Sequence, residues 1–229
     1  MVKKIIEGIE VAIYFRKVKN LRIKVNRDGG VSLIIPTRIS EQVGISFLKS
    51  KMSWVKKCLS KSQGQSPRFT FSSGDKFYLQ GKEIALFVVD SDKNDYLLED
   101  DRLTLFVKNN EKVKEYFYTV LKQLLISYSK PYFEKWEGIT GLKSSKLSIH
   151  KTVSRWGSCN TQTRAVNLSL YLINLPEYCL DYVILHELCH IKYADHGVRF
   201  KRLLSMYMPT WQEVRAYMRE NGNKLRIKE

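Results

Sequence analysis

The stretch HELCHIKYADH, His186 to His196, places three of the chain's four histidines within eleven residues. His186 and His190 are four residues apart. At about 100° per residue, two helical residues at this spacing share one face, so both imidazoles can reach a single ion. Imidazole suits zinc, and Zn–N bonds of about 2.0–2.1 Å fit this geometry. The HExxH pattern therefore predicts a helix that carries two zinc ligands.

Glu187 directly follows the first of these histidines. It lies too far around a helix for easy ligation, but it can reach a water in an open coordination position and take its proton. In the alternative, His186 and His190 are hydrogen-bonded core histidines and Glu187 pairs with a Lys or Arg. The apolar neighbours predict a buried helix, where such groups are costly without a partner or a metal. The sequence therefore favours a metal site with Glu187 as the catalytic base.

His196 is the predicted third zinc ligand. It lies six residues after His190, so on an unbroken helix it would point away from the ion. The sequence YADHG supplies a stop, because Gly197 can follow a terminating turn and Asp195 favours turns. Three protein ligands with one open position are typical of catalytic zinc. The alternative is a solvent-exposed loop histidine.

The composition of the 229 residues fits one domain, or one domain with a smaller attachment. The cysteines are scattered singly, which argues for free thiols in a reducing compartment: Cys58, Cys159, Cys179 and Cys189. Glu7 and Glu10 interrupt the apolar N-terminal run, which argues against a signal peptide. No stretch reaches the ~18 apolar residues of a membrane span. We expect a soluble, cytoplasmic protein that does not bind membranes.

The net charge of +16 is unevenly distributed along the chain. Residues 1–68 carry 15 Lys/Arg against 4 Asp/Glu, residues 69–110 carry 5 against 8, and residues 111–229 carry 19 against 11. The first segment therefore has a net charge of +11. Such a surface attracts polyanions, so nucleic acid is a candidate partner of residues 1–68. In the alternative, this positive charge only keeps the protein soluble and binds no partner.

Periodicity predicts an α+β fold with no internal repeat. In the first part of the chain, strands are expected at residues 11–16 and in a hairpin over 20–36 that turns at Asp28-Gly29-Gly30. Further strands are expected at 82–89 and 102–107, and a pair of strands at 146–159 and 165–173. Helices are expected at about 40–59, with Val43 on the apolar stripe, and from 113, where Pro131 can introduce a kink. Two more are expected from Pro176 and from Thr210, whose spacing to Glu213 suits a capping box. Residues 62–67, SQGQSP, read as a linker.

These features predict three segments. Residues 1–66 form a small basic β/α module, 67–110 a β-strand segment, and 111–229 a mainly helical domain with a short sheet.

Taken together, the motifs resemble the YgjP-like metallopeptidase domain family, a zincin-like HExxH group with SprT-like and WLM proteins as distant relatives. The resemblance covers roughly residues 145–215 and is carried by RWGSC (155–159), VNLSLYLINLP with Asn167, DYVILHELCH, His196, Phe200 and Pro209. A weaker resemblance includes KSKMSWVKK and YLQGK. The resemblance implies that His186, His190 and His196 hold one zinc per chain. It also implies that Glu187 is the general base in the cleavage of a peptide or protein substrate.

Two positions depart from the family pattern. Cys189 replaces a small residue, and Lys201 stands where tryptophan is common after the phenylalanine. Cys189 could approach the metal, but the sequence favours the interpretation that it is a small, buried packing residue. Neither position is one of the predicted ligands, so the departures bear on the shape of the pocket.

Three further residues are candidates for contacting a substrate or oxyanion, or for supporting the site: Arg155, Asn167 and Tyr193. Arg155 could hold a carbonyl oxygen, while Asn167 could bond to nearby backbone. Tyr193 could donate to an oxyanion or simply pack. Trp156 is expected in the core, and no role is predicted for His150.

Two functions remain open. The leading one is a zinc-dependent metallopeptidase with a water activated by Glu187. The alternative is a nucleic-acid-associated binding protein, or a protease of nucleic-acid-bound proteins, that uses residues 1–68.

Overall fold

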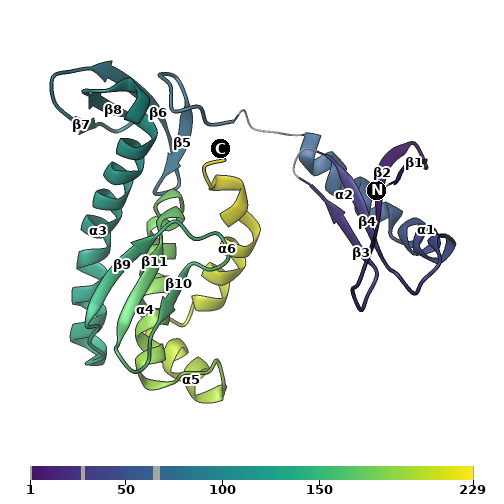
Figure 1. Ribbon diagram of the computed structural model, residues 1–229. Helices are drawn as coiled ribbons and strands as arrows, with labels where there is room; N and C mark the ends of the chain where they lie inside the picture. The colour runs from purple at the N-terminus through teal and green to yellow at the C-terminus, as the bar shows by residue number, and fades with distance from the viewer. Residues whose placement is uncertain (1, 27–28, 64–67, 229) are drawn as a thin grey trace. The chain divides into compact units, whose positions relative to one another are not determined.

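The computed structural model describes residues 2–26, 29–63 and 68–228, with the side chains of 61–63 omitted (Figure 1). Chain contacts divide it into two compact units, Met1–Arg68 and Phe69–Glu229, called here the N-terminal and C-terminal units. Residues 64–67 of the predicted linker, and Asp28 of the predicted hairpin turn, lie outside the described residues. The structure places residues 69–110 in the same unit as the rest of the C-terminal part. The three-segment division stays a prediction.

The N-terminal unit contains a four-stranded sheet of order β1-β2-β4-β3. Its strands are β1 (Val2–Ile6), β2 (Ile9–Arg16), β3 (Arg22–Val25) and β4 (Val31–Pro36). The predicted hairpin is confirmed, since β3 and β4 pair antiparallel. β1 was not predicted. It pairs antiparallel with β2 through the turn Glu7-Gly8, whose φ angles of 50° and 79° are the positive values that tight hairpin turns require.

Two helices, α1 (Glu41–Ser50) and α2 (Met52–Gln63), replace the single predicted helix. The prediction that Val43 lies on the apolar stripe is wrong, because its side chain is 52% exposed. The buried face of α1 is centred instead on Gly44 and Leu48. A Cβ on Gly44 would lie 2.4 Å from Cδ1 of Ile35, so glycine allows the helix to approach β4 closely.

The C-terminal unit contains a second four-stranded sheet, of order β5-β6-β8-β7. Its strands are β5 (Lys76–Leu79), β6 (Lys82–Asp90), β7 (Asp95–Leu98) and β8 (Arg102–Val107). The predictions of β6 and β8 are confirmed, whereas β5 and β7 were not predicted. β7 was hidden in an acidic stretch because only two of its side chains, Tyr96 and Leu98, are partly buried.

The rest of this unit is mainly helical, as predicted, with a three-stranded sheet of order β10-β11-β9. Its elements are η1 (Asn110–Lys112), α3 (Val113–Thr140), β9 (Lys146–His150), β10 (Gly157–Cys159), β11 (Ala165–Ser169), η2 (Leu170–Asn174), α4 (Glu177–Lys192), α5 (Val198–Tyr207) and α6 (Trp211–Leu225). α3 runs on through Pro131 for 28 residues. α5 was not predicted. α6 begins where predicted, but the side chain of Thr210 caps no backbone N–H.

Helix α4 is held in place by contacts on two sides. The turn of the β5–β6 hairpin meets η2, where Gln80 N donates to Ile173 O at 2.7 Å and Gly81 N donates to Asn174 O at 3.3 Å. From α3, the Trp136 indole donates to Asp181 at 2.5 Å. The second sheet and α3 thereby position the helix that carries HELCH. None of the helices in the described part of the chain combines the length and apolarity that a membrane span requires.

Candidate metal centre

The three predicted zinc ligands come together at one end of α4. The helix ends at Lys192, and Tyr193 adopts an extended backbone with φ of −132°. The chain then turns, and His196 returns so that its Nε2 lies 3.0 Å from Nε2 of His186. One nitrogen from each of His186, His190 and His196 lies within 4.8 Å of the others. The helix therefore stops where the third ligand requires it to stop, and metal ligation itself stays a prediction.

Hydrogen bonds orient two of these imidazoles. Nδ1 of His190 lies 3.0 Å from the carbonyl oxygen of Tyr193, which can only accept, so Nδ1 carries the proton and Nε2 is left bare. Nδ1 of His186 lies 3.4 Å from the Tyr182 hydroxyl. Bonds of this kind on the far ring nitrogen set the tautomer that binds a metal. Nε2 is therefore the ligand atom expected of both residues.

Burial favours the neutral form of two imidazoles, His186 and His190. It lowers the pKa of His186 to about 3, with further lowering from His190, His196 and the charge of Arg215. Burial also lowers the pKa of His190. The ring of Phe200 is 1% exposed and lies with its centroid 4.6–4.9 Å from the centroids of all three imidazoles. Neutral imidazole is the form that binds a metal ion, so the environment suits ligation.

Glu187 is 4% exposed, and its Oε2 has no hydrogen-bond partner among the described residues. Burial raises the pKa of its carboxyl to about 8, and the charge of Arg155 opposes that rise. The alternative in which Glu187 pairs with a Lys or Arg finds no support, because the described residues show no ion pair to it. A buried carboxylate oxygen without a partner among the described residues, beside three clustered imidazoles, fits a site for a metal ion with a water.

Gly157 makes room for this carboxylate. A Cβ at that position would lie 2.5 Å from Oε1 of Glu187. Gly157 begins β10, which pairs antiparallel with β11. The structure thereby gives the RWGSC segment a physical role: its glycine lets the strand pass close to the acid.

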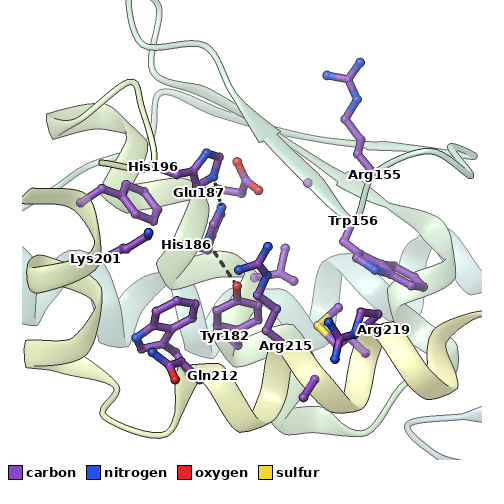
Figure 2. A pocket seen from close by; sticks show the side chains of 16 residues that line it. Arg155, Trp156, Tyr182, His186, Glu187, His196, Lys201, Gln212, Arg215 and Arg219 are labelled. Carbon is purple, nitrogen blue, oxygen red and sulfur yellow. Dashed lines mark hydrogen bonds between the residues drawn. The ribbon is translucent and has the colours of Figure 1, made fainter. Parts of the chain in front are cut away.

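The site opens into a cavity of about 1010 Å³ (Figure 2). His186, Glu187 and His196 lie at its wall. Sequence reasoning missed much of the remaining lining, including Tyr182 of α4 and the side chains that α6 contributes: Trp211, Gln212, Arg215 and Arg219. These α6 residues belong to no recognisable motif, so no local signal pointed to them. The cavity can hold a segment of peptide beside the histidines.

Comparison with known proteins agrees with this geometry. A model of the family "YgjP-like, metallopeptidase domain" matches residues 19–221. The chain belongs to this family. The family assignment made from the HELCH and RWGSC motifs is thereby confirmed.

Individual relatives of this YgjP-like chain match shorter parts. An uncharacterized protein of Methanocaldococcus jannaschii is 34% identical over 68 residues, which is 28% of this chain and 62% of that protein. The chain thus spans under two thirds of that relative's length. The metallopeptidase zymogen jannalysin of the same organism is 26% identical, with 40% of this chain and 88% of the other covered and a TM-score of 0.37. The zymogen abylysin of Pyrococcus abyssi is 20% identical over 44% and 99%, with a TM-score of 0.38.

The other candidate residues of the YgjP-like site lie at different distances from it. Arg155 is exposed and lines the cavity, but in Figure 2 its side chain extends away from the histidines. Asn167 lies on β11, where its Nδ2 is 3.5 Å from the Ser158 hydroxyl. Tyr193 is not part of the cavity lining, and it supports His190 through its carbonyl. Roles for these three in substrate or oxyanion binding stay predictions.

The remaining side chains divide between packing and surface. Trp156 is half-buried and packs on α6, where a Cβ on Gly222 would lie 2.4 Å from its Cζ2. Cys189 is fully buried, as the packing interpretation expects. His150 is exposed on β9. Lys201, the departure from the family pattern, lies in the cavity lining.

Proposed function

We propose that this chain is a zinc-dependent peptidase that cleaves peptide bonds in the cavity of α4 and α6. One observation carries the proposal: three imidazole nitrogens gather within 4.8 Å beside a buried carboxylate oxygen that has no partner among the described residues. The family assignment supports the same activity. The four free cysteines support a reducing, cytoplasmic location.

The residues present fit one zinc ion per chain. His186, His190 and His196 would hold it, since three protein ligands leave one position open, as in catalytic rather than structural zinc sites. When bound, the ion would polarise the scissile carbonyl and lower the pKa of a water molecule. The chain's own residues supply the proton transfers and hold the substrate.

Glu187 is placed to move the proton. Its carboxylate accepts a proton from the attacking water, whose oxygen bonds to the carbonyl carbon of the substrate. The same proton then passes to the leaving nitrogen as the C–N bond breaks. Burial raises the pKa of this carboxyl, and a zinc ion beside it would favour the ionised form that accepts the proton. Gly157 keeps the space that the carboxylate needs.

The substitution Glu187→Gln tests this proposal, because it keeps the side chain's shape and removes the proton acceptor. We expect zinc content and melting temperature near wild type, and hydrolysis of a peptide substrate reduced by about 10²-fold or more. His186→Ala should lose both zinc and activity. Zinc per chain would be measured by inductively coupled plasma mass spectrometry, and hydrolysis with quenched fluorescent peptides.

His150→Ala is the matched control, since it removes an exposed imidazole far along the sequence from HELCH. It should leave zinc content and activity unchanged. A Glu187→Gln protein that melts much earlier yet still hydrolyses peptides would refute the catalytic role. Full zinc retention in His196→Ala would refute the third ligand.

A further inference from the structure

Helix α6 contributes a face of regularly spaced side chains to the cavity. Trp211, Arg215 and Arg219 recur every four residues, so they lie on one side of the helix, and all three line the cavity. Figure 2 shows Arg215 beside Tyr182, which approaches His186. Arg219 follows one helical turn further along. The helix therefore presents two guanidinium groups to whatever occupies the cavity.

The charged groups in the cavity lining are almost all positive. Four cations line it: Arg155, Lys201, Arg215 and Arg219. Glu187 is the single acidic residue in the same lining. This excess of positive charge lies in the cavity that would hold the substrate. It is separate from the positive charge of the N-terminal unit.

The two arginines of α6 have no carboxylate partner among the described residues. Among residues 2–26, 29–63 and 68–228, no ion pair joins Arg215 or Arg219 to an acidic group. The nearby acid Glu220 instead pairs with Lys224, and Glu213 is outside the cavity lining. Elsewhere in this unit exposed lysines do find partners, as Lys135 does in Asp181. The two arginines are thus available to an acidic ligand.

The position of Arg215 ties this charge to the metal centre. Arg215 lines the same cavity as His186 and Tyr182, and Figure 2 shows its side chain beside Tyr182. A cation in a concave site with low-dielectric walls acts more strongly on a ligand than the same cation on an open surface. Guanidinium also matches a carboxylate with two parallel hydrogen bonds, which lysine cannot form. Both arginines are exposed to solvent, but they line the cavity and so face a ligand that binds there.

We propose that Arg215 and Arg219 bind a carboxylate of the substrate close to the scissile bond. The enzyme would therefore prefer acidic peptides, either with an Asp or Glu side chain at that place or with a free C-terminus there. The two arginines are about 6 Å apart along the helix, which corresponds to about two residues of extended peptide. Arg215 serves the position nearer the histidines and Arg219 the position beyond it. This inference rests on the proposed peptidase function.

Binding can be measured apart from catalysis in the zinc-loaded Glu187→Gln protein, by fluorescence anisotropy. The probes are labelled peptides of one sequence that differ only in a Glu, Gln or Lys residue, each made with a C-terminal carboxylate and with a C-terminal amide. We expect the Glu peptide to bind about tenfold more tightly than its Gln counterpart. If the side chain is the ligand, this preference persists in the amides. If the C-terminus is the ligand, the acid form binds more tightly whichever residue is present.

Substitutions then assign the preference to α6. Arg215→Gln with Arg219→Gln should reduce it to less than twofold, and Arg215→Glu with Arg219→Glu should favour the Lys peptide. Arg202→Gln is the matched control, because it removes an arginine of α5 that is outside the cavity lining. Circular dichroism and zinc content would verify that each variant is folded. The reversal in the Glu variants separates recognition from a general loss of structure.

Two results would overturn the inference. One is equal binding of all the peptides, with no gain from either a Glu side chain or a C-terminal carboxylate, and the other is a carboxylate preference that survives in the double Gln variant. Cleavage by the wild-type protein is scored separately. Hydrolysis with no acidic preference would reject the arginine assignment and leave the peptidase standing. Acidic preference in binding without any hydrolysis would reject the peptidase and leave carboxylate binding by α6 standing.

Discussion

The two units contain sheets of the same topology. In each, the outer pairs are antiparallel and the central pair is parallel, with strand orders β1-β2-β4-β3 and β5-β6-β8-β7. Even the first turns match. Glu7-Gly8 has φ angles of 50° and 79°, and Gln80-Gly81 has 50° and 80°. The two units therefore share one sheet topology, although the sequence shows no internal repeat.

The two sheets differ in what their first turns contact. A Cβ on Gly8 would meet nothing within 4 Å, whereas a Cβ on Gly81 would lie 2.7 Å from Cγ of Pro176. Pro176 directly precedes α4. The second turn thus supports the helix with the histidines, whereas in the first turn Glu7 forms an exposed ion pair with Lys56 of α2 at 3.3 Å. One topology serves as a scaffold for the metal centre in one unit and forms part of a separate, strongly basic unit in the other.

The largest expected effect comes from removing matching core leucines. Leu33 of β4 and Leu105 of β8 are both fully buried, and either Leu→Ala change should cost about 2–5 kcal/mol of unfolding free energy. Because the second sheet contacts η2 and Pro176 just before α4, Leu105→Ala should also accelerate zinc loss to a chelator. Leu33→Ala, in the other unit, should not. Thermal unfolding and zinc release would be recorded on the same samples. Equal zinc release from both variants would contradict the division of roles.

The glycines of the two turns offer a finer comparison. Ala at either position is strained by the positive φ, at about 1–2 kcal/mol. Gly81→Ala must also displace Pro176, which adds about 1–3 kcal/mol of overpacking. We expect Gly81→Ala to lower the melting temperature clearly more than Gly8→Ala, as measured by calorimetry. If the two shifts are equal, the contact with Pro176 does not hold the hairpin against η2.

The smallest effect concerns the charge of the N-terminal unit. We propose that its net +11 binds nucleic acid. Arg22→Gln with Lys24→Gln on β3 should lower the slope of log affinity against log salt for duplex DNA by roughly 2, about one per cation removed. Lys143→Gln with Lys146→Gln, two exposed cations of the other unit, is the control and should not change it. Absence of salt-dependent binding near physiological ionic strength would reject nucleic acid as a partner.

Local patterns in the sequence determined the elements whose signal is contained within a few turns or one hairpin. The HELCH helix followed from its histidine spacing, and its end from Asp195 and Gly197. The long helix α3 followed from apolar residues at helical intervals, and the β3–β4 hairpin followed from alternation. In each of these cases the deciding residues are neighbours in the chain, so periodicity and turn chemistry are sufficient to find them. The family assignment used the same local motifs.

Only the tertiary structure showed which distant residues share the site. Arg215 is 29 positions after His186, and only the packing of α6 on α4 brings its charge near the imidazole. Gly157 looks like any glycine in a turn until its strand is seen against Glu187. The repeated sheets likewise share strand order and pairing without a matching sequence pattern. Contacts between elements depend on how faces pack in three dimensions, and a linear pattern contains no information on that packing.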